Sequence, residues 1–224
     1  MHTGLRVAFC AFVLALQPMT ASLASEGPNQ ALMRGASRGD LDAVRAALAA
    51  GASATAGDAR GRTALLQAGA AGHLEVVKAL IEAGADIAHQ DTDKDDLLAV
   101  ATVGGHIEIV RLAVARGASL TVKNRYGGIP IIPAAHRGHV EVVRTLIAAG
   151  SPLDHINNLG WTALIEAVIL GDGGPAHTEI VGLLVSAGAN VNIADRDGTT
   201  PLGHARQRGY RDMISILETA GAKP

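Results

Sequence analysis

Aromatic residues are scarce in this chain. Only 2% of its 224 residues are aromatic, although 48% are hydrophobic. A core with almost no large rings must be built from Ala, Leu, Ile and Val, and that composition suits closely packed helices with short side chains. An excess of one charge is also lacking, since the formal net charge is −2 and the isoelectric point is near 6.5. A nucleic-acid-binding domain commonly shows a basic stripe and a higher isoelectric point, so we expect no nucleic-acid partner.

Cysteine occurs once, at Cys10, in an N-terminal segment that does not resemble folded protein. Arg6 precedes the apolar run 7–16, and small residues follow up to Ala24, which is the pattern of a secretory signal peptide. We therefore expect residues 1–24 to be a signal peptide that is cleaved after Ala24. The apolar run is shorter than the roughly 20 residues that span a bilayer, although an uncleaved membrane anchor is the alternative. Cys10 lies inside the run rather than after it, which argues against a lipoprotein.

Cleavage would leave a mature chain without cysteine, and therefore without a disulfide or a thiol nucleophile. We expect this chain to be secreted across the inner membrane, into the periplasm if the source is Gram-negative. No stable membrane insertion is expected after signal cleavage. Secreted proteins often carry disulfides, but a repeat array with its own core does not require them.

The chain repeats itself along its length. Turn segments of one pattern begin at Asp58, Asp91, Asn124 and Asn157, each 33 residues after the one before, and a fifth begins at Asp195, 38 residues further on. A Gly-His pair recurs inside the units, at Gly72-His73, Gly105-His106 and Gly138-His139, and a glycine follows each second helix, at Gly84, Gly117, Gly150 and Gly188. Glycine is the usual residue where a helix ends in a left-handed conformation. Several landmarks at one period predict stacked pairs of short helices.

The stretches GRTALLQAGAAGHLEVVKALIEAGAD and DRDGTTPLGHARQRGY resemble the ankyrin repeat. That repeat is a unit of about 33 residues made of a β-turn and two helices. The resemblance covers about residues 29–222 and implies an all-α solenoid of helix-turn-helix units with β-turn tips, about six repeats in all. The expected units are a degenerate N-terminal capping repeat at 25–57, repeats at 58–90, 91–123, 124–156 and 157–194, the last with a five-residue insertion, and a C-terminal capping repeat at 195–224.

Helix boundaries follow from single residues in these units. Thr63, Thr162 and Asp96 stand where first helices start, and a side-chain oxygen there can accept a bond from an open backbone N–H group. Pro201 stands at a first helical position, where its missing N–H group costs nothing. Lys94 occupies the turn position at which the pattern has glycine.

The fifth unit carries its insertion as Gly171–Pro175, between its two helices. We expect a loop over these residues, because glycine and proline disfavour a helix. Four histidines share one repeated position, and the resemblance implies a structural role in which each ring bonds the backbone of the adjacent turn. They are His73, His106, His139 and His177.

The turn of the third unit is acidic, with Asp91, Asp93 and Asp95 at alternate positions. This spacing resembles the start of a calcium-binding loop, but the glycine and the glutamate that such a loop requires further on are absent. A solvated acidic turn is the preferred interpretation, and Arg60 and Arg62 on the neighbouring tip are expected to pair with it.

A polar cluster on the first helices suggests one possible chemistry. His136, Glu166 and His204 come close if their faces align across neighbouring units, which would permit a zinc or acid–base site. The chain has no phosphate-binding loop and no nucleophile and base at a recognisable spacing. We therefore expect no enzyme activity, no cofactor and no metal.

The predicted function is that of a non-catalytic protein–protein interaction module, a scaffold, adaptor or inhibitor that is monomeric and binds an unidentified protein. A solenoid presents its turn tips and first helices as one concave stripe. Tyr126 and Trp161, on adjacent tips, are the expected anchors, because aromatic residues and arginine are frequent binding hot spots. The expected contact residues are Arg60, Arg62, Asp93, Asp95, Tyr126, His136, Arg137, Trp161, Glu166 and Asp197. The alternative is a small-ligand or metal-binding protein that uses the groove near His136 and Glu166.

Overall fold

The computed structural model of the protein describes residues 27–223. This part of the chain contains twelve α-helices and no strand, apart from one isolated bridge between Gly57 and Thr63. None of the described helices is long and apolar enough to cross a membrane. The signal peptide expected at 1–24 lies outside the described residues, and its cleavage stays a prediction.

The helices follow one another in six pairs. They are α1 (Pro28–Arg38), α2 (Leu41–Ala49), α3 (Ala64–Ala71), α4 (Leu74–Glu82), α5 (Leu97–Gly104), α6 (Ile107–Ala115), α7 (Ile131–His136), α8 (Val140–Ala148), α9 (Ala163–Ile169), α10 (Pro175–Ser186), α11 (Pro201–Arg208) and α12 (Arg211–Thr219).

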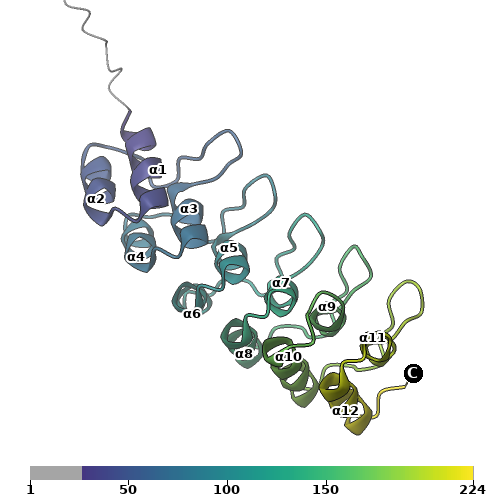
Figure 1. Cartoon of the computed structure of the whole chain (residues 1–224). Helices are drawn as coiled ribbons and strands as arrows, with labels where there is room; N and C mark the ends of the chain where they lie inside the picture. The colour runs from purple at the N-terminus through teal and green to yellow at the C-terminus, as the bar shows by residue number, and fades with distance from the viewer. Residues whose placement is uncertain (1–26, 224) are drawn as a thin grey trace, which may run out of the picture.

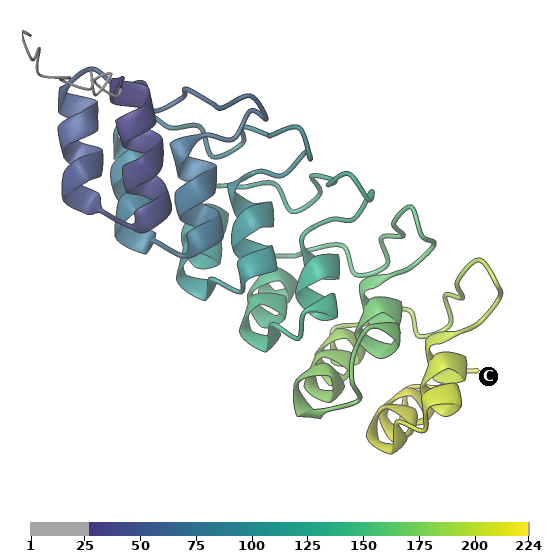
Figure 2. The ribbon, with the colours of Figure 1, turned by 45° about the horizontal axis from the view of Figure 1, so that its top comes forward.

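The pairs stack side by side into two layers, as Figures 1 and 2 show. Each odd-numbered helix packs against the next odd-numbered helix, and each even-numbered helix against the next even-numbered one. The loops from each even helix to the next odd helix project together on the side of the odd-numbered layer. We call the ends of these loops the tips, defined as residues 58–62, 91–95, 124–128, 157–161 and 195–199. The all-α solenoid of about six repeats is confirmed.

Aliphatic side chains hold neighbouring pairs together. The same position of four successive even-numbered helices is a valine with no exposed surface, at Val77, Val110, Val143 and Val181. No aromatic residue belongs to the fully buried core of the described residues. Short side chains let the helices approach closely, and each pair covers the apolar face of the next.

The predicted helix caps form hydrogen bonds. The Thr63 hydroxyl accepts a bond from the backbone N–H of Leu66, at 3.3 Å, and the Thr162 hydroxyl does the same for Ile165, at 3.2 Å. The Asp96 carboxylate accepts from Ala99 at 2.8 Å. Pro201 is the first residue of α11, as expected. Past the second helices, Gly84, Gly117, Gly150 and Gly188 all have φ between 80° and 93°.

The repeated histidines fix each pair against the pair before it. Each Nε2 atom contacts the carbonyl oxygen of a residue near the end of the odd-numbered helix in the preceding pair. The contacts are His73 to Ser37 at 3.3 Å, His106 to Ala70 at 3.0 Å, His139 to Val103 at 3.2 Å and His177 to His136 at 3.0 Å. In the last pair Tyr210 takes this place, and its hydroxyl donates to the Gly171 carbonyl at 3.1 Å. The structural role expected for these histidines is confirmed.

The insertion of the fifth unit is a loop over residues 171–174 only. The prediction was wrong for Pro175, which is the first residue of α10. A proline at that position needs no N–H partner, so it begins a helix rather than ending one. The Asp172 carboxylate closes the loop by accepting a bond from the Gly174 N–H at 2.8 Å.

Lys94 is the one described residue other than glycine with a positive φ, at 64°. The equivalent residues of the other tips are Gly61, Gly127, Gly160 and Gly198, with φ of 71°, 72°, 87° and 78°. A residue with a Cβ atom pays roughly 1–2 kcal/mol for this conformation, whereas glycine does not.

We expect Lys94→Gly to raise the free energy of unfolding by about 0.5–1 kcal/mol, because the gain in the folded state exceeds the added entropy of the unfolded chain. Urea unfolding would measure the change. Lys94→Ala is the control, since it removes the charge but keeps the Cβ atom, and it should not stabilise the protein. Equal stabilisation by both variants would attribute the effect to charge and contradict the backbone explanation.

Candidate partner-binding groove

The five tips share one internal hydrogen-bond pattern. The first residue of each tip is Asp or Asn, and its Oδ1 atom accepts bonds from the backbone N–H groups two and four residues later. In one tip Asn157 accepts from Leu159 at 2.9 Å and from Trp161 at 3.0 Å, and the same pattern holds at Asp58, Asp91, Asn124 and Asp195. The backbone therefore keeps one shape while the side chains at the third and fifth tip positions vary.

Backbone hydrogen bonds also join the first four tips to one another. The backbone N–H of Thr92 donates to the Arg60 carbonyl at 2.9 Å. In the same way, the backbone N–H of Arg125 donates to the Asp93 carbonyl at 3.0 Å, and that of Asn158 to the Tyr126 carbonyl at 2.9 Å. These bonds place the third-position side chains in a row. From the first tip to the last the row reads Arg60, Asp93, Tyr126, Leu159 and Asp197.

Ion pairs along the row neutralise Asp93. Its two carboxylate oxygens contact Arg60 at 2.6 Å and Arg125 at 3.0 Å, one from each neighbouring tip. Arg62 lies with its Nε atom 3.3 Å from the Asp91 carboxylate. The expected pairing of Arg60 and Arg62 with the acidic turn is therefore present, and Arg125 joins it. The two pairs of Asp93 are solvent-exposed, and pairs of this kind contribute about 0–1 kcal/mol each to stability.

A groove of about 450 Å³ lies between these tips and the odd-numbered helices. Six of the expected contact residues line it, namely Asp93, Asp95, Tyr126, His136, Arg137 and Glu166. Arg60 touches this set through its ion pair with Asp93. Arg62, Trp161 and Asp197 are not among the lining residues, and Trp161 is half-buried.

The groove is open because the middle unit carries little side-chain volume there. Gly128 stands at the fifth tip position, where the flanking tips have Asp95 and Trp161. A Cβ atom built on Gly128 would meet nothing nearer than 3.6 Å. On α7, Pro133 takes the position that Glu166 holds on α9.

Glu166 is the buried acid of the groove, with a side chain that is 7% exposed. Its Oε1 atom accepts a bond from the Asn157 side-chain amide at 2.7 Å, and its Oε2 atom lies 3.7 Å from the Nδ1 atom of His136. That second distance is too long for a hydrogen bond. Burial raises the pKa of Glu166 to about 7, although the Asn157 bond opposes the shift. Burial and the charge of Arg137 lower the pKa of His136, so the two groups form a weak ion pair at most near neutral pH.

Asp95 is the second acid of the groove and is half-buried. Burial, together with the neighbouring carboxylates of Asp91 and Asp93, raises the pKa of Asp95 to about 6, and Arg62 opposes this shift. Two carboxyl groups with raised pKa values therefore line one groove.

His204 does not join His136 and Glu166. Its Nε2 atom lies 2.7 Å from the Asp195 carboxylate at the base of its own tip, and its side chain is 11% exposed. No group of three or more His, Cys, Asp or Glu within residues 27–223 is placed to hold a metal ion. The three-residue site considered from the sequence is therefore wrong, because the short local bond to Asp195 holds the ring.

Several lining residues were not among the expected contacts, notably Arg125, Asn157, Leu159 and Leu170. Leu159 is 49% exposed and Leu170 is 40% exposed. Leu159 occupies the same third tip position as Tyr126, so aligning the tips by column would have identified it. No sequence signal pairs Asn157 with Glu166.

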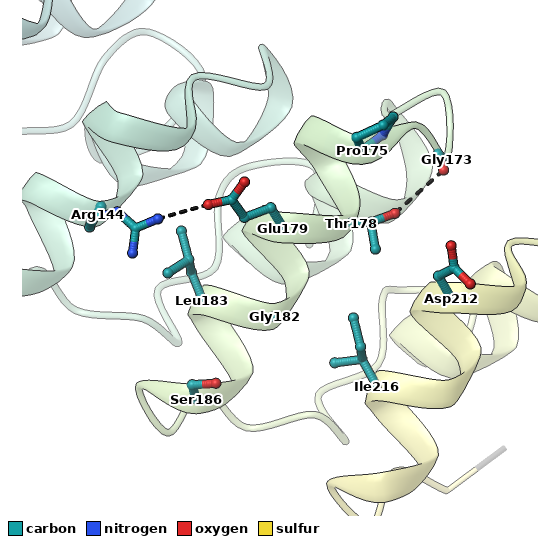
Figure 3. Close-up of a pocket in the computed structure, with 10 residues that line it drawn as sticks. All are labelled: Arg144, Gly173, Pro175, Thr178, Glu179, Gly182, Leu183, Ser186, Asp212 and Ile216. Atoms are coloured by element: carbon teal, nitrogen blue, oxygen red, sulfur yellow. Dashed lines mark hydrogen bonds and ion pairs between the residues drawn. The ribbon is translucent and has the colours of Figure 1, made fainter.

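A second hollow, of about 660 Å³, lies on the opposite face between α8, α10 and α12 (Figure 3). It exists because Gly182 interrupts a row of cations, after Lys78, Arg111 and Arg144 on the earlier even-numbered helices. Arg144 at its edge is paired with Glu179 at 2.7 Å. None of the expected contact residues lines this hollow.

A family model for ankyrin repeats in three copies matches the chain at residues 11–91, 97–195 and 131–224. The chain belongs to the ankyrin-repeat family. Ankyrin repeat domains generally mediate protein–protein interactions, and the ankyrin fold is typically not enzymatic.

Solved ankyrin structures resemble this chain over most of its length. An ankyrin repeat domain from Acinetobacter baumannii AYE is 48% identical, with a TM-score of 0.80 over 86% of this chain and 98% of that one. The ankyrin repeat protein EF0377 is 35% identical, with a TM-score of 0.79 over 85% of this chain and 97% of that one.

The ankyrin repeat protein YahD of Escherichia coli (strain K12) is 45% identical over 62 residues, which span 28% of this chain and 31% of YahD.

The raised pKa of Glu166 predicts a pH-dependent effect of Glu166→Gln. A folded-state pKa of about 7, against 4.5 ordinarily, means that the folded protein binds this proton more tightly than the unfolded chain. The free energy of unfolding of the wild type therefore falls as pH rises from the ordinary pKa to the raised pKa. The destabilisation is complete above the raised pKa. Gln keeps the acceptor for Asn157 without a charge, so the variant should be more stable than wild type at about pH 8, by on the order of 1–3 kcal/mol.

At about pH 4 the two proteins should have nearly equal stability, because Glu166 is then neutral in both folded and unfolded wild type. Urea unfolding of both proteins at the two pH values measures the difference. The contributions of all other titrating groups cancel when the two proteins are compared at the same pH. A difference that is the same at both pH values would contradict the assignment.

Proposed function

We propose that this ankyrin chain is a non-catalytic interaction module, a scaffold, adaptor or inhibitor, that binds a partner protein through the groove and its tips. The observation that carries the proposal is a pair of exposed apolar side chains at the rim, Tyr126 at 54% and Leu159 at 49% exposure, on adjacent tips. Large apolar side chains beside a depression, surrounded by polar groups, are common anchors of protein interfaces.

The variable tip positions support this assignment over catalysis. Nearly all polar groups that recur from unit to unit are used within the fold, as the histidines and the tip carboxylates show. What differs from unit to unit is the row of tip side chains and the groove below it. A small-ligand role for the groove is a second candidate, because 450 Å³ falls in the usual range of about 300–1,000 Å³ for ligand sites.

The place of action is proposed to be outside the cytoplasm, after export by the N-terminal signal and cleavage following Ala24. The sequence pattern of residues 1–24 carries this part of the proposal. Mass spectrometry of the protein from its native cells should find a mature N-terminus at Ser25. A chain that retains Met1 would contradict cleavage.

Gly128→Leu tests the groove directly. Gly128 does not have a positive φ, and a Cβ atom there would make only ordinary contacts with Asn124 and Ile132, so the variant should fold and fill the groove. We expect a partner captured by wild type from an extract of the secreted compartment to be lost by Gly128→Leu, because its contact surface is blocked. Pull-down followed by an affinity measurement with the purified partner would check this.

Glu179→Gln is the matched control, since it changes a charge on the opposite face beside Arg144. This variant should keep the partner. A partner that a folded Gly128→Leu variant still binds with unchanged affinity would show that another surface is used.

A further inference from the structure

The carboxyl groups of the groove differ in what neutralises them. Asp93 contacts two arginines, at 2.6 and 3.0 Å. Among residues 27–223, Asp95 forms no ion pair, although the charge of Arg62 acts on it from further away, and the ionisable partner of Glu166 is His136, at 3.7 Å. The groove thus contains one acid that is paired with arginine and two that are not.

Of these two acids, Glu166 gives the stronger indication of a cationic ligand, because its side chain is more than nine-tenths buried. Its Oε1 atom is bonded to Asn157, and Oε2 has no hydrogen-bond donor among the described residues. A buried carboxyl group without a cation is costly to ionise, and a cationic donor would remove that cost. Burial raises the pKa of Glu166 to about 7, which agrees with an acid that lacks its cation.

The shape of the groove also suits a long side chain with a charged end. Its walls include the apolar residues Val103, Ile132, Leu159 and Leu170, and the ring of Tyr126. The stems of lysine and arginine pack well on apolar surface while the charged end reaches a polar group. The volume of about 450 Å³ admits such a side chain together with neighbouring backbone.

The cations of the groove do not occupy this place. Arg125 is held at the tip by Asp93 and by the Tyr126 hydroxyl, to which it donates at 2.7 Å. Arg137 is exposed and could attract an acidic ligand instead. An acidic probe is therefore the necessary comparison.

We propose that the groove recognises its partner through one basic side chain, an arginine or a lysine, whose charge is bound by Glu166 and whose stem lies against Tyr126 and Leu159. This inference rests on the proposed function, because it specifies the chemistry of the partner segment that enters the groove. The complementary segment is an exposed stretch of polypeptide that carries an arginine or lysine side chain.

Four capped tripeptides test the inference, each with glycine on both sides of a central arginine, lysine, norleucine or glutamate. They are titrated into the 15N-labelled protein at about pH 8, where Glu166 is ionised. The arginine and lysine peptides should shift the side-chain amide signals of Asn157 and the backbone signal of Gly128. The norleucine and glutamate peptides should shift them far less.

Glu166→Gln should weaken binding of the arginine peptide about tenfold or more, because it removes a charge-assisted hydrogen bond. The change is nearly isosteric and keeps the acceptor for Asn157, so the fold is retained. Glu179→Gln on the opposite face should leave binding unchanged. Preferential binding of the glutamate peptide, equal binding of norleucine, no shift with arginine at any soluble concentration, or undiminished binding by Glu166→Gln would each overturn the inference.

The outcome can be told apart from failure of the proposed function. If Gly128→Leu abolishes capture of the natural partner but the peptides do not discriminate by charge, the groove is an interface and the basic-side-chain inference is wrong. If Gly128→Leu leaves the partner bound, the groove itself is not the interface.

Discussion

Each helix pair of this chain buries its apolar residues against the neighbouring pairs of the stack. Val77, Val110, Val143 and Val181 have no exposed surface only because a neighbouring pair covers them. The histidine-to-carbonyl contacts then fix how far one pair can slide past the next. Because one repeated contact sets the position of every unit, the tips also fall into a regular row, and their variable side chains can form a continuous surface.

The hydrogen bonds that repeat in every tip also limit which residues can carry a function. The Asp or Asn that opens each tip bonds the same two backbone groups in all five tips, so it is committed to the fold. The side chains at the third and fifth tip positions do not make these bonds, and they differ from unit to unit. One unit has Gly128 and Pro133 where its neighbours carry larger side chains, and this local loss of volume creates the groove.

The two faces of the stack are electrostatically unlike. On the even-numbered helices Arg111 and Arg144 lie between glutamates of their own and the next helix, with Arg144 to Glu179 at 2.7 Å and Arg111 to Glu141 at 4.0 Å. These two arginines are thus paired within their own face. In the groove, the charge of Asp93 is satisfied while Glu166 is buried without a cation. A surface that leaves a buried charge unsatisfied is better suited to binding than one whose charges are paired.

Sequence by itself determined the number of units and the helix starts at Thr63, Thr162 and Asp96, and its resemblance to the ankyrin repeat implied the structural role of the repeated histidines. These features depend on local backbone chemistry and on a repeat period that is visible in this single sequence. Tertiary structure alone decided that His204 bonds Asp195, that Asn157 bonds Glu166, and that Leu159 lines the groove while Trp161 does not. Those outcomes depend on which side chains come within hydrogen-bond distance when the units stack, and on the volume that a glycine leaves empty. The spacing of residues along the chain determines neither.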